Sequence, residues 1–308
     1  MGKIRVAING FGRIGRVFTR AIQGNDGIEL VAINDLSDTV TLAHLLKYDS
    51  VHRGFIGTVS ANENEIIING NTVKVFNEKD PENLPWSSLD IDVVVEATGI
   101  FRTRALASKH IKAGANKVIL SAPAKEDGIR TVVMGINDDL IDGTEQIISN
   151  ASCTTNCAAP MVKIIDELCR IQNGYITTIH SYTGDQRLHD APHSDLRRAR
   201  AAAESIVPTT TGAAKAITKI FPHLHGHMGG VGIRVPVPDG SLTDITCIVE
   251  TPVSADKLNN VFKEYAEGSL KGIIEYIEDP IVSTDIIGNT HSVIYDSELT
   301  SVIGNMIK

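Results

Sequence analysis

The chain has 308 residues, 42% of them hydrophobic and 21% charged, a composition typical of globular proteins, and its length indicates about two domains. The formal net charge of −8 disfavours a nucleic-acid scaffold, and no apolar run approaches the roughly 18 residues that a membrane span requires. Four cysteines are too few for a disulfide framework, and the first residues enter a strand pattern without room for a signal peptide, so we expect a cytoplasmic protein with no nucleic-acid or membrane partner.

The N-terminal segment has the pattern of a dinucleotide-binding fold. An apolar run at residues 4–8 leads into Gly10-Phe-Gly-Arg-Ile-Gly15, then a helical segment at 16–23, a second apolar run at 29–33, and Asp35. This order of strand, glycine turn, helix, strand and acid is typical of a site that binds a pyrophosphate at the helix N-terminus. A glycine turn in a nucleotide-free α/β protein is the alternative, and the flanking elements and the acid argue against it.

Each glycine of the turn has a separate expected role. Gly10 permits the tight turn, Gly12 lets the backbone approach a pyrophosphate, and Gly15 lets the helix and the strand pack closely. Asp35 lies about 20 residues beyond the last glycine, where a carboxylate can accept hydrogen bonds from both ribose hydroxyls of an adenosine.

Further short apolar runs predict parallel strands that are covered on both faces. Two of these strands end at Thr98-Gly99 and at Ser121, which should therefore line the crevice at the carboxyl edge of the sheet. A crossover helix is expected at 105–113 with Gly114 as its stop, and an antiparallel excursion at 51–75 around an Asn69-Gly70 turn. The predicted strands are 92–96, 117–121, 131–136 and 146–149.

The stretch Asn150-Ala-Ser-Cys-Thr-Thr-Asn-Cys157 places a cysteine among small polar residues just before an amphipathic helix. A thiolate at Cys153 would be stabilised there by the helix N-terminus, which favours a nucleophile. A small buried thiol is the alternative, and Pro160 allows a kink or a late helix start. We place the boundary here, which gives domains 1–152 and 153–308 and a nucleophile that faces the cofactor across the junction.

The second half supplies a candidate base. A strand pattern at 175–179 leads to His180-Ser-Tyr-Thr183, and a histidine at a strand end can act as a general base for a thiol. A lone histidine is more often structural, so this interpretation depends on Cys153. His223-Leu-His225-Gly-His227 suggests zinc, but no acid or cysteine accompanies it in the sequence, so we interpret it as a polar loop and expect no metal.

Three segments are candidate phosphate sites. Residues 190–203 form a basic stretch, with Arg197, Arg198 and Arg200, that could simply be a solvated helix. Residues 208–215 form a hydroxyl- and glycine-rich turn into a helix, and Arg234 lies in a strand where its guanidinium can grip a phosphate. Thiol, imidazole, dinucleotide and anion sites together indicate aldehyde oxidation.

With these motifs the chain closely resembles the glyceraldehyde-3-phosphate dehydrogenase family, from Lys3 to its last residue. The resemblance implies an α/β protein with a Rossmann NAD-binding domain and a second α+β catalytic domain built on a mixed, largely antiparallel sheet. It also implies a homotetramer in which residues 181–203, like the family's S-loop, pack near a neighbour's cofactor. The motifs that carry it are Asn9-Gly-Phe-Gly-Arg-Ile-Gly-Arg16, Ser149-Asn-Ala-Ser-Cys-Thr-Thr-Asn-Cys157, His180-Ser-Tyr-Thr183 and residues 208–215.

The resemblance also implies roles for individual residues. Cys153 is the nucleophile and His180 the base. Cofactor-binding positions are Asn9, Gly10, Phe11, Gly12, Arg13, Ile14, Gly15, Asp35, Lys79, Thr98, Gly99 and Ser121. Phosphate-binding positions are Thr183, Asp185 and Arg234 for the substrate phosphate, Ser152, Thr154, Thr211 and Gly212 for the attacking phosphate, and Arg198 beside them.

The implied reaction is the oxidation of glyceraldehyde 3-phosphate by NAD and inorganic phosphate. A Cys153 thiohemiacetal is oxidised to a thioester while His180 accepts the hydroxyl proton, and phosphate releases 1,3-bisphosphoglycerate. The related erythrose-4-phosphate dehydrogenase, and a truncated, inactive dinucleotide-binding or interaction protein, are the alternatives.

Two features depart from the family pattern. Ala191-Pro192 stands where NAD-specific relatives often have Leu-Pro, although Leu36 after Asp35 is typical of NAD enzymes. The sequence ends at Lys308, whereas the family continues through a strand, a Trp-Tyr-Asp-Asn-Glu motif and a closing helix. The asparagine that would orient the nicotinamide is absent, so we expect either a longer native polypeptide or severely impaired turnover.

Overall fold

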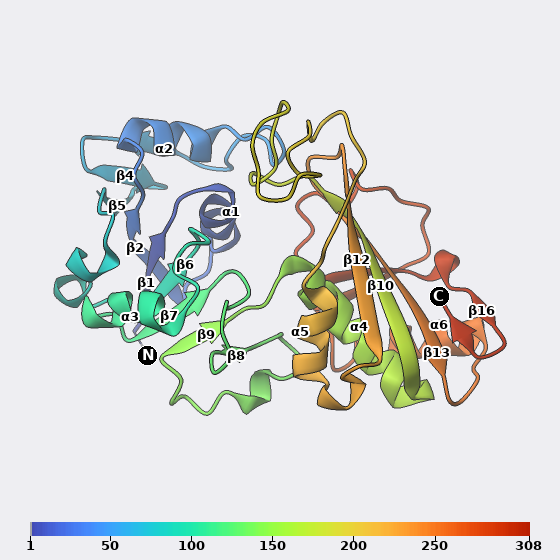
Figure 1. Cartoon of the computed structure of the whole chain (residues 1–308). Helices are drawn as coiled ribbons and strands as arrows, with labels where there is room; N and C mark the ends of the chain where they lie inside the picture. Colours follow the sequence, from blue (N-terminus) through green and yellow to red (C-terminus); the bar gives the residue numbers. More distant parts are fainter. Residues whose placement is uncertain (1) are drawn as a thin grey trace. The chain divides into compact units, whose positions relative to one another are not determined.

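The structure, a computed structural model, describes residues 2–308 and divides into two compact units (Figure 1). The first unit runs up to Val132 and resumes at Leu140–Ala151, and the second contains Val133–Asp139 and Ser152–Lys308. The segment Val133–Asp139 falls within the first domain predicted from the sequence, yet it belongs to the second unit, where Gly135 packs against Leu270 and Ile273.

The first unit is built on a nine-stranded sheet in the order β3-β4-β5-β2-β1-β6-β7-β9-β8. The central strand β1 pairs in parallel with β2 on one side and with β6 on the other. The direction of winding therefore reverses at β1, and such a reversal opens a crevice at the carboxyl ends of the strands. The strands are β1 Ile4–Asn9, β2 Ile28–Asn34, β3 Val59–Ala61, β4 Glu65–Ile68, β5 Asn71–Phe76, β6 Val93–Glu96, β7 Lys117–Leu120, β8 Arg130–Thr131 and β9 Ile147–Ser149.

Apolar side chains cover both faces of this sheet. One cluster contains Ala7, Trp86 and Val94, and the other contains Ile8 and Ile33, so neighbouring residues of a strand enter opposite clusters. This double burial explains the continuous apolar runs of the sequence. The helices of this unit are α1 Arg13–Ala21, α2 Thr39–Lys47, α3 Arg104–Lys112 and the short 3-10 helices η1 Pro81–Asn83 and η2 Ser87–Leu89, with η3 Asp138–Leu140 at the division between the units.

Most local predictions for this unit are confirmed. The antiparallel excursion forms from β3, β4 and β5, and Asn69 and Gly70 both adopt positive φ values, 51° and 84°, at its turn. Helix α3 begins after the cap Thr103 and stops before Gly114, whose φ is +108°. Helix α1 begins at Arg13, three residues earlier than predicted.

The strand predicted at 131–136 is wrong beyond Thr131. The chain turns there instead, because side chains take the backbone N–H groups that a strand would pair. Asn137 Oδ1 accepts from Val133 N at 2.8 Å, and Asp138 Oδ1 accepts from Gly135 N at 2.7 Å. Strand β8 therefore contains only Arg130–Thr131, and the last bond to β9 runs from Val132 N to the Ser149 carbonyl oxygen at 2.8 Å.

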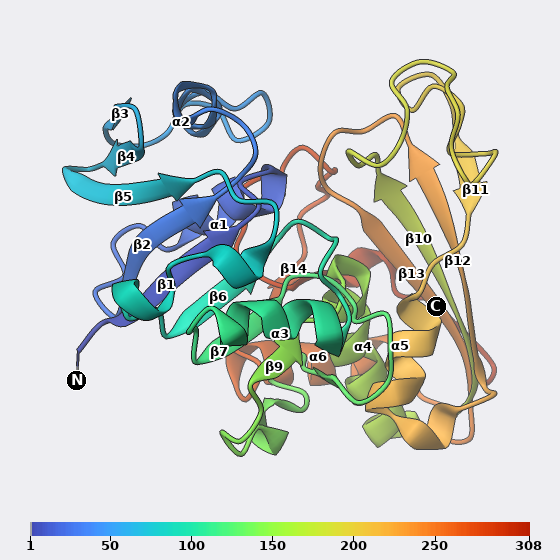
Figure 2. The ribbon, with the colours of Figure 1, turned by 60° about the vertical axis from the view of Figure 1, so that its left-hand side comes forward.

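The second unit is built on a six-stranded mixed sheet in the order β11-β12-β10-β13-β17-β16, as predicted. The long strand β10 pairs in parallel with β12 and antiparallel with β13. Helices α4 and α5 pack together on one face of this sheet (Figures 1 and 2). The strands are β10 Ile171–Ser181, β11 Val207–Thr209, β12 Met228–Val235, β13 Leu242–Val249, β16 Val302–Ile303 and β17 Met306–Ile307, with β14 Ile274–Ile277 and β15 Val293–Asp296 as a separate parallel pair.

Of the helices considered in the sequence analysis for the second unit, the one after the cysteine motif is present and the one at residues 190–203 is absent. Helix α4 begins at Cys153 and continues through the buried Pro160, so the late start allowed for by the sequence does not occur. Residues 190–203 are not helical, because Asp190 and Asp195 bind backbone N–H groups of Ala201 and Arg197 and hold turns instead. The helices are α4 Cys153–Cys169, α5 Ala213–Ile220, α6 Ala255–Glu267, η4 Pro222–Leu224 and η5 Ser297–Leu299. Within residues 2–308, no helix combines the length and apolarity of a membrane span.

The turn between β1 and α1 depends on two glycines. Gly10 has a φ of +92°, and a Cβ there would lie 2.8 Å from the Thr98 backbone nitrogen. A Cβ at Gly15 would lie 2.3 Å from the Gly10 carbonyl oxygen, whereas a Cβ at Gly12 would meet no atom within 4 Å. The close packing of α1 on β1 therefore requires glycine at position 15 and not at position 12.

We expect Gly15→Ala to lower the free energy of unfolding by about 1–3 kcal/mol, because its methyl group must displace backbone. Gly12→Ala is the matched control and should stay within about 0.5 kcal/mol of the parent. Denaturant unfolding of both variants measures this, and equal stability of the two would contradict the packing described for Gly15.

Candidate active site

A thiol and an imidazole meet within the second unit. Cys153 is the first residue of α4, His180 is the penultimate residue of β10, and Cys153 Sγ lies 3.3 Å from His180 Nε2. Ser152 caps the helix, because its Oγ accepts from Thr155 N at 3.1 Å. The first amides and the dipole of α4 favour negative charge at Cys153, so the sulfur stands where a thiolate is stabilised.

The other ring nitrogen of His180 fixes the direction of proton transfer. His180 Nδ1 lies 2.7 Å from the Ser181 carbonyl oxygen, which only accepts hydrogen bonds, so Nδ1 carries a proton. Arg234 Nη1, which only donates, lies 3.1 Å from Nδ1, but it also donates to the Ser181 carbonyl at 3.1 Å, and the shorter contact of Nδ1 with that acceptor decides the tautomer. In the neutral ring, Nε2 is therefore the acceptor that faces the Cys153 sulfur.

The four cysteines are all free thiols, and their environments separate them. The surrounding protein disfavours a charged sulfur at Cys153, but the hydrogen bond and charge of His180 and hydrogen bonds from Thr154 outweigh this and lower the pKa of Cys153. Burial instead raises the pKa of Cys157 to about 11 and that of Cys247 to about 12, and it raises the pKa of Cys169 as well.

A chain of polar side chains continues from His180. Arg234 Nη1 donates to Thr183 Oγ1 at 3.0 Å, and Thr183 donates in turn to Asp185. Asp185 accepts from Arg198 Nη1 at 2.8 Å, so one carboxylate lies between two guanidinium groups. Burial, and to a smaller extent the charge of Arg198, lower the pKa of Arg234, while the charges of Asp185 and Cys153 act in the opposite direction.

The same surroundings act on Asp185. Burial opposes its ionisation, but the Thr183 hydrogen bond and the charges of Arg198 and Arg234 outweigh burial and lower the pKa of Asp185.

A second small group of candidate residues lies at helix N-termini. Thr211 Oγ1 accepts from Ala213 N at 3.2 Å, and Gly212 caps α5 without a side-chain hydrogen bond. The backbone at the start of α5 thus remains suited to an anion.

The predicted cofactor residues surround the carboxyl ends of β1, β2 and β6 in the first unit. Gly12 caps α1 without a side-chain hydrogen bond and with open space at its Cα, which suits a pyrophosphate. Asp35 follows β2, and its carboxylate accepts from Phe11 N at 2.8 Å and from Ser37 N at 2.9 Å. Ile14, Lys79 and Gly99 are exposed, and Ser121 Oγ donates to the Glu96 carbonyl at 2.9 Å.

Comparison with known proteins identifies the family. One family model, described as the NAD binding domain of glyceraldehyde 3-phosphate dehydrogenase, matches residues 4–104, and another, described as the C-terminal domain of that enzyme, matches residues 152–308. The chain belongs to the glyceraldehyde-3-phosphate dehydrogenase family. The first match identifies NAD as the cofactor, and the residues around Gly12 and Asp35 fit it.

Curated relatives agree with this assignment. The chain is 56% identical to glyceraldehyde-3-phosphate dehydrogenase of Thermotoga maritima, over 98% of this chain and 91% of the relative. It is 53% identical to the enzyme of Geobacillus stearothermophilus, over 99% and 91%, and 53% identical to glyceraldehyde-3-phosphate dehydrogenase 2 of Streptomyces avermitilis, over 99% and 92%. The resemblance drawn from the motifs is therefore confirmed, together with the fold class and the cofactor.

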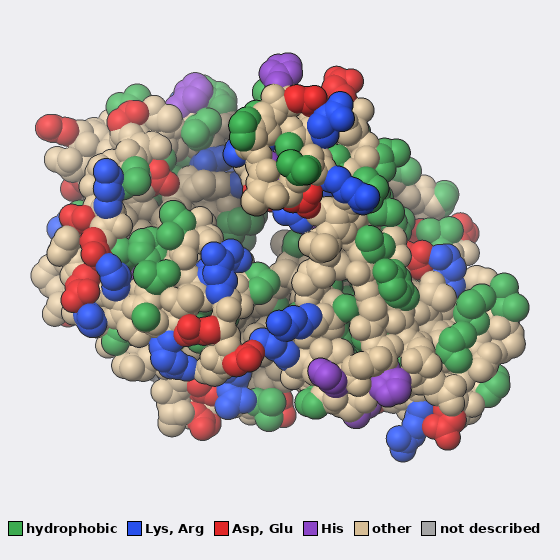
Figure 3. Space-filling view, in the orientation of Figure 1, with side chains coloured by type: hydrophobic (Ala, Val, Ile, Leu, Met, Phe, Trp, Pro, Cys, Tyr) green, Lys and Arg blue, Asp and Glu red, His purple; other side chains and the backbone are tan. Residues whose placement is uncertain are grey.

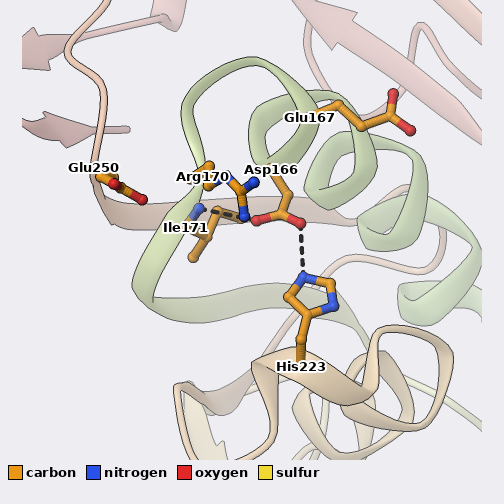
Figure 4. Close-up of a pocket in the computed structure, with 6 residues that line it drawn as sticks. All are labelled: Asp166, Glu167, Arg170, Ile171, His223 and Glu250. Carbon is orange, nitrogen blue, oxygen red and sulfur yellow. Dashed lines mark hydrogen bonds and ion pairs between the residues drawn. The ribbon is translucent and has the colours of Figure 1, made fainter.

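The histidine-rich loop lies apart from the thiol chemistry. Its first histidine, His223, points at Asp166 of α4, with 2.7 Å between Nε2 and Oδ2, while Asp166 Oδ1 accepts from Ile171 N (Figure 4). His227 contacts Asn173 instead. An acid thus accompanies His223 after all, from 57 residues earlier in the chain, but it serves to join α4 to η4.

Surface charge is mixed on the face shown in Figure 3, where Lys and Arg side chains are interspersed with Asp and Glu side chains. Several of these charges form exposed pairs, such as Arg200 with Asp190 at 2.8 Å. This is the pattern of an ordinary solvated surface.

Three polar contacts in and near the site were not predicted from the sequence. These are the Ser181 carbonyl that fixes the His180 tautomer, the hydrogen bond of Thr243 to Cys157, and the buried carboxylate of Glu96 beneath Thr98. The Ser181 carbonyl is a backbone group, which no residue pattern can reveal. Glu96 alone had a visible signal, since an acid at the end of an apolar strand needs an explanation.

We expect limited iodoacetamide treatment at neutral pH to label Cys153 before the other three cysteines, because only its pKa is lowered. The labelling rate should rise with pH and level off once Cys153 is ionised, at a lower pH than for any other thiol. His180→Gln removes the group that lowers the pKa and leaves the opposing effect of burial, so labelling should slow about tenfold for each unit that the pKa rises. Peptide mass spectrometry measures this, and earlier labelling of Cys169 or Cys247 would contradict the assignment.

Proposed function

We propose that this chain is a phosphorylating glyceraldehyde-3-phosphate dehydrogenase, which oxidises D-glyceraldehyde 3-phosphate with NAD and inorganic phosphate to 1,3-bisphosphoglycerate. The contact between Cys153 and His180, with Arg234 and Thr183 beside it, carries the proposal. It combines a nucleophile of lowered pKa, a base in the required tautomer and cationic groups for a substrate phosphate within one unit. The relatives named above bear the same enzyme name.

In the proposed reaction, Cys153 Sγ attacks the aldehyde carbon and forms a C–S bond. His180 Nε2 takes the thiol proton and passes it to the aldehyde oxygen, which becomes the thiohemiacetal hydroxyl, and the first amides of α4 stabilise negative charge on that oxygen as it develops. His180 Nε2 then accepts the hydroxyl proton as the substrate carbon is oxidised and a thioester is left on Cys153. NAD, when bound, supplies the chemistry of hydride acceptance.

Release of the product needs a second nucleophile. An oxygen of inorganic phosphate attacks the thioester carbonyl, the C–S bond breaks, and the Cys153 thiolate leaves. Because the pKa of Cys153 is lowered, its thiolate is stabilised, and this makes the sulfur both an available nucleophile and a good leaving group. The acyl phosphate thereby keeps the free energy of the oxidation that hydrolysis would lose.

The two phosphates would bind at different places in the second unit. Thr183, Asp185, Arg198 and Arg234 are connected through hydrogen bonds and are proposed to hold the substrate phosphate. Asp185 would act there by orienting Arg198, since a carboxylate does not itself attract an anion. The attacking phosphate is proposed to lie at Ser152, Thr154, Thr211 and Gly212, which lie at or near the starts of α4 and α5.

The cofactor is proposed to bind the first unit through the turn Asn9–Gly15 and the strand ends that follow it. The N-terminus of α1 would bind the pyrophosphate, and Asp35 would accept hydrogen bonds from the ribose. The proposed contacts are Asn9, Gly10, Phe11, Gly12, Arg13, Ile14, Gly15, Asp35, Lys79, Thr98, Gly99 and Ser121.

A homotetramer in the cytoplasm is proposed as the working form. Leu188, Leu196 and Ile206, in and just after the stretch that resembles the S-loop, are between 70% and 81% exposed, which is unfavourable unless another surface covers them. The four free thiols suit a reducing compartment. Light scattering on the protein as it elutes from a size-exclusion column measures the mass of the assembly, and a mass near 33.1 kDa would show a monomer.

We expect NADH formation from glyceraldehyde 3-phosphate to depend on inorganic phosphate and to be lost in Cys153→Ser. Without phosphate, the reaction should stop at the thioester, so that about one NADH forms per Cys153. Absorbance at the NADH band measures both. Better turnover of erythrose 4-phosphate would favour the related dehydrogenase instead, and NAD binding without turnover of either aldehyde would favour the inactive binding protein.

We expect NAD to be preferred over NADP, because the Asp35 carboxylate would repel a 2′-phosphate and the exposed Leu36 beside it supplies no compensating cation. Asp35→Ser should lower kcat/KM with NAD and narrow the preference. Steady-state kinetics with both cofactors measure this. Equal efficiency with NADP in the parent enzyme would refute the role of Asp35.

A further inference from the structure

A row of buried polar side chains lies at the carboxyl edge of the first sheet. Asn34, Asn9 and Glu96 are the last residues of β2, β1 and β6, and they lie opposite one another in the register of the three strands. Their residues are only 4%, 1% and 2% exposed. Polar groups buried this deeply are costly unless each one finds a partner, so their hydrogen bonds must be accounted for one by one.

The Glu96 carboxylate is the centre of this row and accepts from every side. Its Oε2 accepts from Asn9 Nδ2 at 2.6 Å and faces His110 Nε2 at 3.1 Å. Its Oε1 accepts from Thr98 N at 2.8 Å and from the Thr98 hydroxyl. Among these partners only the Thr98 hydroxyl could also accept, and the convergence of the Asn9 and Thr98 N–H donors on the two oxygens favours the ionised carboxylate.

The charge of Glu96 is not balanced by a cation. Trp86 Nε1, which can only donate, lies 3.1 Å from His110 Nδ1, so this ring nitrogen must accept. The proton of the neutral His110 ring is then on Nε2 and is donated to Glu96. The contact of Asn9 Nδ2 with His110 Nε2 at 3.4 Å follows, because both donors approach the same oxygen. Glu96 is thus a buried anion that is stabilised by dipoles alone.

This anion sets the direction of a longer relay. Because Asn9 must donate to Glu96, its Oδ1 is left to accept, and it does so from Asn34 Nδ2 at 2.7 Å. Asn34 Nδ2 also donates to the Glu78 carbonyl, and Asn34 Oδ1 accepts from Glu78 N, both at 2.9 Å. Both amides are therefore held in one orientation, by the Glu96 charge at one end of the row and by the Glu78 backbone at the other.

Each end of the relay borders a proposed cofactor contact. Gly10 directly follows Asn9, Asp35 follows Asn34, and Lys79 follows Glu78. Thr98 is held by Glu96 through both its N–H and its hydroxyl, and its backbone packs against Gly10 so closely that a Cβ on the glycine would lie 2.8 Å away. The four segments that converge on the proposed NAD site are thus joined beneath it by one network.

We propose that Glu96 is a positioning residue for NAD, whose buried charge orders the relay through Asn9 and Asn34 and thereby fixes the segments that carry Gly10, Asp35, Lys79 and Thr98. This inference rests on the proposed NAD-dependent function. Glu96 touches no reacting group. It acts through the backbone positions of the residues that contact the cofactor.

The isosteric change Glu96→Gln tests the charge without changing the shape. An amide nitrogen on the Oε1 side would face the fixed Thr98 N–H. On the Oε2 side, the amide nitrogen of the new glutamine would face the His110 Nε2–H. It would also require the Asn9 side-chain amide to exchange the positions of its oxygen and nitrogen. The Asn34 amide would then have to do the same, and its nitrogen would face the Glu78 N–H. Every arrangement leaves two donors in contact, so the relay cannot be satisfied.

We expect calorimetric titration of NAD at 25 °C to show a dissociation constant raised about tenfold or more in Glu96→Gln, with a matching rise in the KM for NAD and little change in kcat at saturating NAD. The iodoacetamide reactivity of Cys153, in the second unit, should not change. A residue with a purely structural role would lower stability and leave the affinity of the folded protein as it was.

Ile66→Ala is the matched control for stability. Ile66 is a fully buried residue of β4 in the same unit and takes no part in the relay. Trp86 is the chain's single tryptophan, so its fluorescence reports the unfolding midpoint of this unit. We expect Ile66→Ala to lower the midpoint while its dissociation constant for NAD stays within about twofold of the parent.

Asn34→Asp keeps the test decisive if Glu96→Gln does not fold. The new carboxylate still accepts from Glu78 N but cannot donate to Asn9 Oδ1, so the relay breaks at its other end and NAD should again bind more weakly. A folded Glu96→Gln or Asn34→Asp protein with parental NAD affinity would overturn the inference. Failure of the parent protein to bind NAD would instead overturn the proposed function.

Discussion

The chemistry proposed for this protein depends on the 3.3 Å contact between Cys153 Sγ and His180 Nε2. The surroundings of the sulfur would by themselves raise the pKa of the thiol, and the imidazole is the principal group that reverses this. The contact in turn requires two backbone features. Helix α4 must begin at Cys153, and the carbonyl that follows His180 must hold its Nδ1 proton so that Nε2 faces the sulfur.

Arg234 links this pair to the groups that are proposed to bind the substrate phosphate. One of its nitrogens reaches both the Ser181 carbonyl that orients the imidazole and the Thr183 hydroxyl that leads to Asp185 and Arg198. An anion bound by these groups would therefore lie close to the groups that activate the thiol. Arg234, one of the cations proposed to bind the substrate phosphate, also interacts electrostatically with the Cys153 thiolate.

In the first unit, four separate chain segments must keep fixed relative positions beneath the proposed NAD site. Its two apolar clusters hold the strands together but carry no directional information. The row of Asn34, Asn9 and Glu96 adds direction, because each hydrogen bond determines the next. Hydrophobic burial thus accounts for the sheet, and the polar row accounts for the fixed positions of its carboxyl edge.

The parts of the fold that follow from local pattern could be predicted from the sequence. The glycine turn, the apolar runs of the parallel strands and the Asn69-Gly70 turn each depend on residues close together in the chain. The strand prediction failed where side chains took over backbone hydrogen bonds, as Asn137 and Asp138 do after Thr131. The helix that was the alternative for the basic stretch is absent for the same reason, at Asp190 and Asp195. These competing bonds depend on the turn that they stabilise, so the apolar pattern does not reveal them.

The candidate site was predictable to the extent that its residues lie in motifs. Cys153 and His180 were paired through chemistry and family resemblance, but the tautomer of His180 depends on a backbone carbonyl. Apart from the local contacts of Glu96 with Thr98, the Glu96 network joins residues between 14 and 101 positions apart, and no local sequence pattern indicates such contacts.

The central claim is that Cys153 carries the substrate as a thioester that only phosphate releases. Mass spectrometry of the protein mixed with NAD and glyceraldehyde 3-phosphate, without inorganic phosphate, tests it most directly. The account predicts an acyl group on the peptide that contains Cys153, which disappears when phosphate is added. An adduct on another residue, or NADH formation at an undiminished rate with no adduct at all, would contradict it.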